Sequence, residues 1–155
     1  MLWNLYLRNG TAFVPTVTQT EAGFFLDADP VAVVPADETE ALQNAVKQAI
    51  GRGNPRVPVP TRAAFPKPVV LRYAKVKSWP AFEKGCSNWT VVEKDGLYQI
   101  KRGRKRPDRG WEDDPAQIET LPPGIGIDEI AQRVASSVQS ALRALEEPRS
   151  KSGPE

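Results

Sequence analysis

The stretch that decides the fold is Asn88-Trp89-Thr90-Val91-Val92-Glu93-Lys94-Asp95-Gly96-Leu97-Tyr98-Gln99-Ile100-Lys101-Arg102. It contains two runs rich in β-branched and aromatic residues, 88–93 and 97–102, which are typical of strands. An Asp-Gly pair lies between them, and this pair favours a tight turn in which both residues adopt a positive φ. The stretch therefore predicts a β-hairpin.

Further strands are expected at the N-terminus. Trp3, Leu5 and Leu7 alternate with polar or amphipathic residues, which is the period of a half-buried strand. Asn9-Gly10 predicts a hairpin turn into a second strand over 12–17. Two short apolar runs follow, 23–26 and 31–34, and Asp29-Pro30 between them predicts a turn.

Two amphipathic helices are expected. The first follows Asp37, which has the spacing of a capping box with Glu40. Its apolar stripe consists of Leu42, Ala45, Val46, Ala49 and Ile50. The second begins at about Asp128, and its stripe consists of Ile127, Ile130, Val134, Val138, Ala141 or Leu142, and Leu145.

The segment between these parts is rich in proline. Five prolines in 54–68 exclude a helix or an inner strand, so we expect an extended strap. A strand over 69–74 and a short helix over 79–84, capped by Ser78, follow the strap. Residues 103–124, rich in charge, glycine and proline, are expected to be irregular.

These elements predict an α+β protein with a mostly antiparallel sheet, or two sheets, and two principal helices. The expected organisation is a strand-rich module over 1–53 that ends in a helix, the strap over 54–68, a sheet-and-helix module over 69–147 and a disordered tail over 148–155. Whether the two halves share one sheet stays open at this stage.

Composition excludes several chemistries. The 155 residues include no histidine, one cysteine and one methionine, so a histidine base, a triad and an imidazole metal site are impossible. Asp27 and Asp29 are spaced like turn residues more than like metal ligands. Cys86 has no histidine to activate it, and Gly124-Ile125-Gly126 is a poor match to a phosphate-binding loop. We therefore expect no enzyme activity, no metal and no cofactor.

Charge is distributed unevenly along the chain. The net charge of +2 divides into −3 over 1–54, +10 over 55–110 and −5 over 111–155. No apolar run is long enough to span a membrane and the N-terminus is unlike a signal peptide, so we expect a cytoplasmic protein. The cationic middle block predicts an electric field that a partner could use.

A basic run is the strongest local feature of that block. Six of the nine residues in 101–109 are cationic, and Trp111-Glu112-Asp113-Asp114 follows. The run can bind a protein, bind nucleic acid, or lie solvated and balanced by the acids. Trp111 is either an interface anchor or a side chain packed on the sheet. The predicted partner-binding residues are Arg102, Arg104, Lys105, Arg106, Arg109, Trp111, Glu112, Asp113 and Asp114.

Two segments carry a resemblance to a known family. They are Tyr73-Ala74-Lys75-Val76-Lys77-Ser78-Trp79-Pro80-Ala81-Phe82-Glu83-Lys84 and the hairpin Trp89 to Ile100, followed by the terminal helix. Over about residues 69–145 the chain resembles immunity proteins of bacterial contact-dependent growth inhibition systems. The resemblance implies a cytosolic non-enzyme that binds one cognate toxin domain and covers its active site. It identifies no binding residue.

The function predicted from the sequence is therefore a non-enzymatic binding protein, most concretely an immunity protein whose partner is a cognate toxin domain. The alternative is a small nucleic-acid-associated protein that uses the run 101–109. Neither reading involves a membrane, and the oligomeric state is left open. A toxin gene next to the gene of this protein would discriminate between them.

Overall fold

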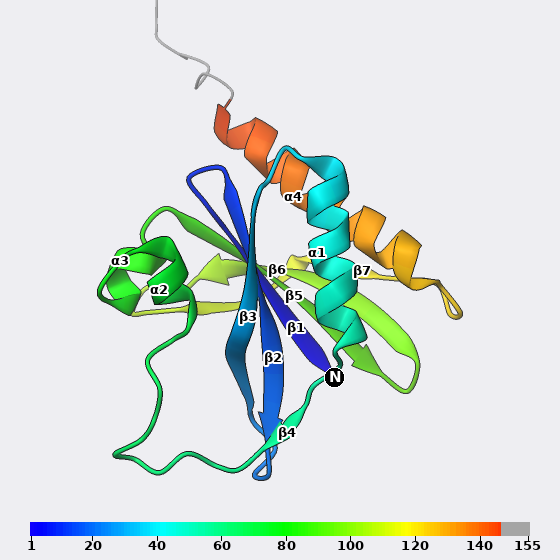
Figure 1. Cartoon of the computed structure of the whole chain (residues 1–155). Coiled ribbons are helices and arrows are strands. Elements are labelled where there is room, and N and C mark those ends of the chain that lie inside the picture. The colour runs from blue at the N-terminus through cyan, green and yellow to red at the C-terminus, as the bar shows by residue number, and fades with distance from the viewer. Residues whose placement is uncertain (147–155) are drawn as a thin grey trace, which may run out of the picture.

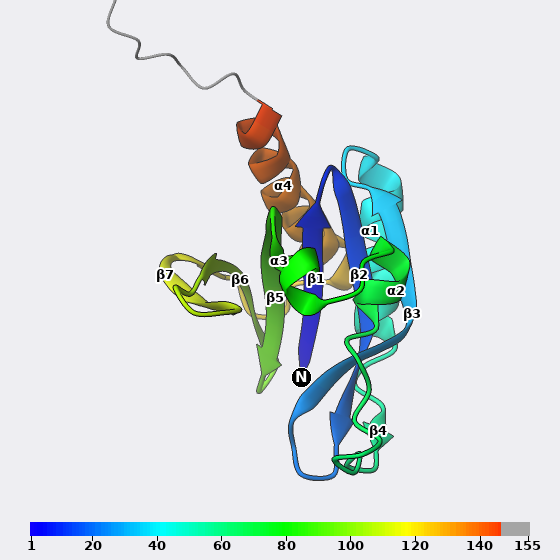
Figure 2. The ribbon, with the colours of Figure 1, turned by 90° about the vertical axis from the view of Figure 1, so that its left-hand side faces the viewer.

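The computed structural model describes residues 1–146, and within them seven strands form one sheet with helices on both faces (Figures 1 and 2). The elements are β1 (Leu2–Arg8), β2 (Thr11–Thr20), β3 (Phe25–Pro35), α1 (Thr39–Gly51), β4 (Arg56–Val57), α2 (Val70–Ala74), α3 (Trp79–Glu83), β5 (Cys86–Lys94), β6 (Leu97–Lys105), β7 (Trp111–Thr120) and α4 (Ile127–Glu146). The predicted tail, 148–155, lies outside the described residues.

The sheet joins the two halves of the chain. Its strand order is β3-β2-β1-β5-β6-β7, and all neighbours on this path are antiparallel. β1 and β5 pair over their whole length, from Leu2 opposite Val92 to Arg8 opposite Cys86. The short β4 pairs with β2 in parallel. The α+β class is confirmed, and the two halves share one sheet.

Both predicted hairpin turns are present. Asn9 and Gly10 have φ of 51° and 76°, and Asp95 and Gly96 have φ of 53° and 80°. Positive φ at both central residues matches the right-handed twist of the flanking strands, which explains the choice of these residue pairs.

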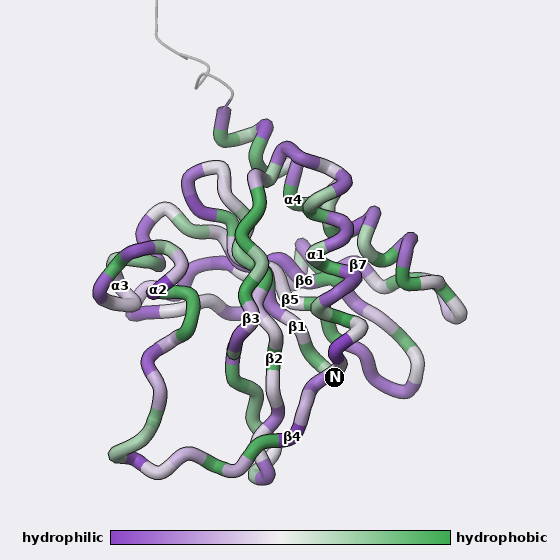
Figure 3. The backbone as a smooth tube through the Cα atoms, viewed as in Figure 1, coloured by the Kyte–Doolittle hydropathy of each residue, from purple (hydrophilic) through white to green (hydrophobic). Residues whose placement is uncertain are grey.

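The two long helices cover one face of the sheet and pack on each other. The five residues of the predicted α1 stripe are all buried, and Val134 and Val138 of α4 are fully buried. They meet Trp3, Leu5 and other apolar residues from the strands of both halves in one core. In Figure 3 the two helices alternate between hydrophilic and hydrophobic positions, as amphipathic helices do.

A second, smaller core lies on the opposite face. Here α2 and α3 cover aromatic and apolar side chains of the sheet, with Tyr6 and Phe82 in contact at a ring-centroid distance of 5.4 Å. Tyr6 lies on the face of β1 that the alternation assigns to water. The alternation of β1 predicted the larger core but not this second one. Tyrosine and arginine were counted as polar because of their end groups, although the rest of each side chain is apolar and can be buried.

Two predicted elements are corrected by the structure. Residues 69–74 were expected as a strand, but 70–74 form helix α2, whose Val70 and Leu71 are buried in the second core. Residues 103–124 were expected to be irregular, but β6 continues to Lys105 and β7 occupies 111–120. Pro115 is tolerated because β7 is an edge strand with a register irregularity opposite Arg102.

Two local predictions in the first half are also wrong. The chain does not turn at Asp29-Pro30, because β3 runs through both residues. They form a bulge in β3, where its pairing with β2 shifts between Pro15 and Thr16. α1 begins at Thr39, and no side chain caps it, so Asp37 is not the capping residue. The Ser78 cap of α3 is confirmed, since its Oγ accepts from the Ala81 amide at 3.3 Å.

The strap begins at a fixed point. Asn54 Nδ2 donates to the carbonyl oxygens of Leu2 and Val17 at 2.8 and 2.9 Å, and Asn54 Oδ1 accepts from the Leu2 amide at 3.0 Å. After β4 the strap leaves the sheet as a long loop that returns at α2 (Figure 1). No helix among residues 1–146 has the length and apolarity needed to cross a membrane.

Candidate functional site

The basic run lies on the β6–β7 hairpin, where acidic residues face it. Three ion pairs form there: Lys101 with Asp113 at 3.1 Å, Arg104 with Glu112 at 2.7 Å, and Arg106 with Asp108 at 3.1 Å. The second follows from strand register, which sets Arg104 opposite Glu112, whereas Asp113 lies opposite Gly103 and pairs with Lys101 two residues away. Residues 101–114 hold six basic and four acidic residues, so the net charge of the hairpin is only +2.

Three further members of the predicted site, Arg102, Lys105 and Trp111, take part in cation–ring contacts. The Arg102 guanidinium lies 5.2 Å from the ring centroid of Trp89, and the Lys105 ammonium lies 5.8 Å from that of Trp111. Lys105 Nζ also donates to the carbonyl oxygen of Glu83, which ties β6 to the end of α3. These contacts favour fixed positions for all three side chains.

Trp111 packs on the sheet. Its ring lies 5.8 Å from Trp79 and 6.1 Å from Tyr6, so it belongs to the aromatic cluster of the second core and is only half-exposed. Gly103 permits this packing, since a Cβ there would lie 3.0 Å from the Cβ of Trp111. The packing favours the structural reading of Trp111 over the interface-anchor reading.

The structure thus brings together most of the predicted site residues, but mainly with one another. Asp114 is half-buried and accepts from the Ala116 amide at 3.1 Å. Among the described residues, Arg109 is the one cation of the set with neither an ion pair nor a ring contact. The hairpin offers less uncompensated charge than its sequence indicates.

A larger feature lies on the same side of the sheet as α2. The end of the strap, the middle of β3 and the short helices line two neighbouring open hollows, of about 730 Å³ and 520 Å³, which together form a cleft. Both parts are lined by Asp27 and by Pro66, Lys67 and Pro68 of the strap. We call this feature the strap cleft.

The floor of the strap cleft is a hydrogen-bonded triad of polar side chains. Tyr6 Oη donates to Asp27 Oδ2 at 2.6 Å, and Asn4 Nδ2 donates to Asp27 Oδ1 at 2.8 Å. Burial raises the pKa of Asp27, although the hydrogen bonds from Tyr6 and Asn4 act in the opposite direction. Burial also raises the pKa of Tyr6 well above its usual value, and the charge of Asp27 adds to this effect.

Asp29 belongs to a different group at the edge of the cleft. Arg72 Nη2 donates to both oxygens of its carboxylate at 2.8 Å, and Tyr73 Oη donates to it as well. The hydrogen bonds from Tyr73 and Arg72 lower the pKa of Asp29. Asp27 and Asp29 therefore have separate partners.

Cys86 is a buried thiol on β5. Burial raises its pKa to about 12, despite the opposing influence of Lys105 and Arg8. A thiol with this pKa carries almost no thiolate at neutral pH, which makes it a poor nucleophile. The structure supports its interpretation as a small buried residue.

Uncompensated positive charge is concentrated in the segment that contains the strap, and Lys67, Arg72 and Lys77 of this segment line the cleft. Residues 52–84 hold eight basic residues and one acidic residue, a net charge of +7. Within residues 1–146, Arg72 is the only one of these cations that forms an ion pair. The acidic residue, Glu83, is buried and accepts from the Gly110 amide at 2.6 Å.

Three residues discussed from the sequence, Asp27, Asp29 and the predicted partner-binding residue Arg109, line the strap cleft, but the sequence analysis did not predict a site there. The floor of the cleft combines positions 4, 6 and 27, which only the folded sheet brings together. The excess of basic residues in 52–84 is visible in the sequence. The predicted binding residues were nevertheless placed in and after the run 101–109, because basic residues are denser there.

The fold defines an α+β protein with one sheet that carries helices on both faces. Comparisons with known proteins add a similar fold but no function. A solved structure described as a protein of unknown function, NMB0488, from Neisseria meningitidis is similar with a TM-score of 0.61. The similarity covers 88% of this chain and 93% of that one at 16% sequence identity, so it concerns the fold alone. No protein-family model and no curated protein matches the chain.

Proposed function

We propose that this protein is a non-enzymatic binding protein of the immunity type, which binds a cognate bacterial toxin domain and covers its active site. The proposal rests on the resemblance of 69–145 to contact-dependent growth inhibition immunity proteins. In this proposal the protein acts in the cytoplasm, where an incoming toxin domain would reach its target.

One observation carries the proposal: unpaired cations and exposed apolar side chains occur together around the strap cleft. Phe65, which lines the cleft, is 52% exposed, and the lining also includes Lys67 and Lys77, which form no ion pair within residues 1–146. Charges steer association and apolar side chains give an interface its binding energy, so this combination supports a protein partner. The hairpin residues Arg102 to Asp114 form a second, more neutral part of the proposed interface.

Nucleic-acid binding is the second candidate function. The net charge of +7 over 52–84 favours any anionic partner, including phosphate groups. The run 101–109 is the weaker site for this function, because its ion pairs with Glu112, Asp113 and Asp108 reduce the charge that phosphates would meet. A nucleic acid would therefore bind the strap.

Co-expression tests the proposed function. The protein is produced beside the toxin domain encoded next to its gene, survivors are counted, and the two proteins are copurified. We expect survival and a stable complex with that toxin domain, and no protection against an unrelated one. Cell death at full expression of both proteins would overturn the proposal.

A further inference from the structure

We propose that the strap cleft receives an extended acidic segment of the partner protein, with one apolar side chain of that segment inserted between the strap and β3. The identity of the partner rests on the proposed function, whereas the chemistry of the segment follows from the cleft itself.

The two hollows of the cleft adjoin. Both are lined by Asp27 and by Pro66 to Pro68, so a segment that binds this end of the strap contacts both of them. Apolar walls are provided mainly by Phe25, Leu26, Phe65, Leu71 and Trp79. A part of about 520 Å³ has room for a large side chain and the backbone around it.

Charge determines which segment fits. The two carboxylates at the cleft already have partners, since Asp27 accepts from Tyr6 and Asn4, and Asp29 from Arg72 and Tyr73. The cations at its edge, Lys67, Lys77 and Arg109, form no ion pair within residues 1–146. The cleft therefore attracts carboxylates and repels basic segments.

The strap favours recognition by side chains. Prolines 58, 60, 66 and 68 have no N–H to offer, so the strap cannot pair with a partner strand as a regular sheet edge would. Proline also limits the conformations of the strap before binding, which reduces the entropy lost when the partner is ordered against it.

A polypeptide fits this cleft better than nucleic acid does. Besides its aromatic side chains, the cleft is lined by Pro66, Pro68, Val69 and Val76, which suit an aliphatic or aromatic side chain of a polypeptide. Single-stranded nucleic acid usually needs a row of flat aromatic platforms beside a cationic track. In the strap cleft Phe65 is exposed, but Trp79 is half-buried in the aromatic cluster.

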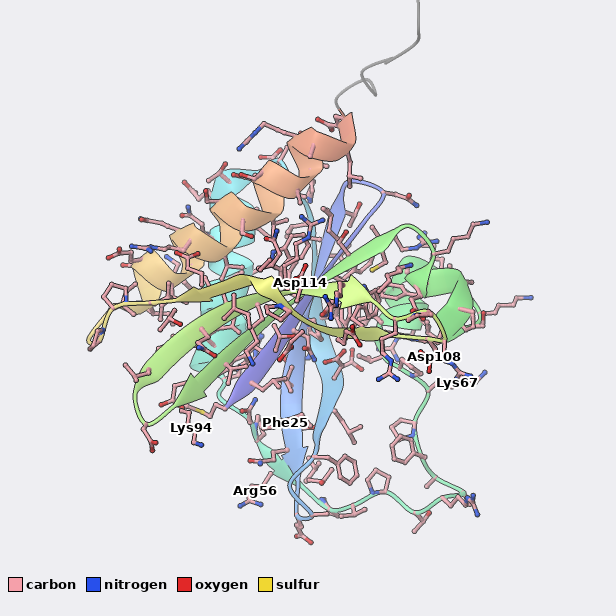
Figure 4. The ribbon with its side chains drawn as sticks, turned by 180° about the vertical axis from the view of Figure 1, so that it is seen from behind. Phe25, Arg56, Lys67, Lys94, Asp108 and Asp114 are labelled. Carbon is pink, nitrogen blue, oxygen red and sulfur yellow. The ribbon has the colours of Figure 1, made fainter. Side chains whose placement is uncertain are left out.

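The test measures binding of a short fluorescein-labelled peptide, rich in aspartate and glutamate with one central phenylalanine, to the full-length protein by fluorescence anisotropy. Three other labelled probes are compared with it: the same peptide with alanine for phenylalanine, a peptide with lysine for every acid, and single-stranded oligothymidine. The variants are Lys67→Glu with Lys77→Glu, and Phe65→Ala. The control, Lys94→Glu with Arg143→Glu, has the same net charge as the first variant. Figure 4 shows Lys67 and Lys94 on opposite sides of the molecule.

We expect the acidic peptide to bind and the lysine peptide not to bind. The double reversal at the cleft should weaken binding by about tenfold or more, whereas the control should change it by about twofold. Phe65→Ala and the alanine peptide should each weaken binding. The inference is overturned if the acidic peptide does not bind, if the control loses as much as the cleft variant, or if oligothymidine binds more tightly than the peptide.

Survival in the toxin assay separates the two proposals. If the wild type protects cells and the Lys67→Glu, Lys77→Glu variant protects equally well, the cleft inference fails and the immunity function stands. If the wild type gives no protection but the acidic peptide binds at the cleft, the proposed function fails and the cleft inference stands.

Discussion

The β6–β7 hairpin and the segment 52–84 are both strongly basic in sequence, but they present different surfaces. In the hairpin, antiparallel register places acids of β7 beside bases of β6, and three ion pairs reduce the net charge. The segment 52–84 is mostly strap and short helices, without a facing acidic strand, and within residues 1–146 Arg72 alone among its cations forms an ion pair. Charge that is dense in sequence is thus not the charge that a partner meets. The topology decides which cations remain available.

The largest expected effect concerns the scaffold that holds both regions in place. Val134 on α4 is fully buried, so Val134→Asp would place an unpaired charge in the core and should lower the free energy of unfolding by several kcal/mol, about 3 or more. Urea denaturation measures this loss. A wild-type midpoint for Val134→Asp would show that α4 does not cover the sheet.

The matched control for that variant is Ser136→Asp on the exposed side of α4. Ser137 is less suitable, although it was expected to tolerate this change. Its Oγ accepts a hydrogen bond from Trp89 Nε1 at 2.9 Å, and it is half-buried. Ser137→Asp should therefore destabilise the protein, by about 1 kcal/mol or more.

The next effect compares one aromatic residue from each region. Trp111 of the hairpin packs on Trp79 and Tyr6, so Trp111→Ala should cost about 2 kcal/mol of stability. Phe65 of the strap is 52% exposed, so Phe65→Ala should leave stability nearly unchanged and weaken partner binding. Thermal unfolding and binding, measured on both variants, would contradict the comparison if Trp111→Ala changed only binding.

A smaller effect is expected from the acids at the cleft, and its sign is fixed by their pKa shifts. The pKa of Asp27 is raised above its ordinary 3.8 in the folded protein, so folding favours the protonated acid. The free energy of unfolding should then fall as pH rises from 3.8 through the raised pKa. Asp27→Asn should lack this fall, and parallel curves for the two proteins would contradict the burial of Asp27.

Asp29 should show the opposite sign. Its pKa is lowered by Tyr73 and Arg72, so its contribution to stability is present above pH 3.8 and is lost as pH falls through the lowered pKa. Urea denaturation at a series of pH values on Asp29→Asn and Asp27→Asn measures both. Effects of the same sign would show that the two carboxylates do not have separate environments.

The smallest effect is expected from the ion pairs of the hairpin. Arg104 and Arg106 are about half exposed, so reversing both should cost less than about 1 kcal/mol per pair. Lys105 is left out because its bond to the Glu83 carbonyl is structural. A loss of several kcal/mol for Arg104→Glu with Arg106→Glu would show that the pairs hold the hairpin together.

Much of the fold can be predicted from local sequence patterns, and the elements that were predicted wrongly have physical explanations. The hairpins and both long helices were predicted because each depends on turn residues or apolar spacing within one segment. β7 was missed because its acids and Pro115 disfavour a strand, and only the pairing with β6 and the edge position make it one. Helix α2 was missed because a short apolar run after proline fits a helix or a strand equally well.

The candidate site was less readable than the fold. The basic run was visible, but the ion pairs that neutralise much of it depend on the register of β6 with β7. Asn4, Tyr6 and Asp27 meet only because β1 and β3 lie on either side of β2. Long-range pairing of this kind leaves no trace in one sequence, so the strap cleft could not be predicted from it.

The most direct test of the account compares the two basic regions under one probe. Binding of labelled polyglutamate is measured for the wild type, for Lys67→Glu with Lys77→Glu, and for Arg104→Glu with Arg106→Glu, two variants of equal net charge. We expect the strap variant to bind about tenfold more weakly than the hairpin variant, because Lys67 and Lys77 form no ion pair within residues 1–146, whereas Arg104 and Arg106 do. An equal or greater loss in the hairpin variant would contradict it.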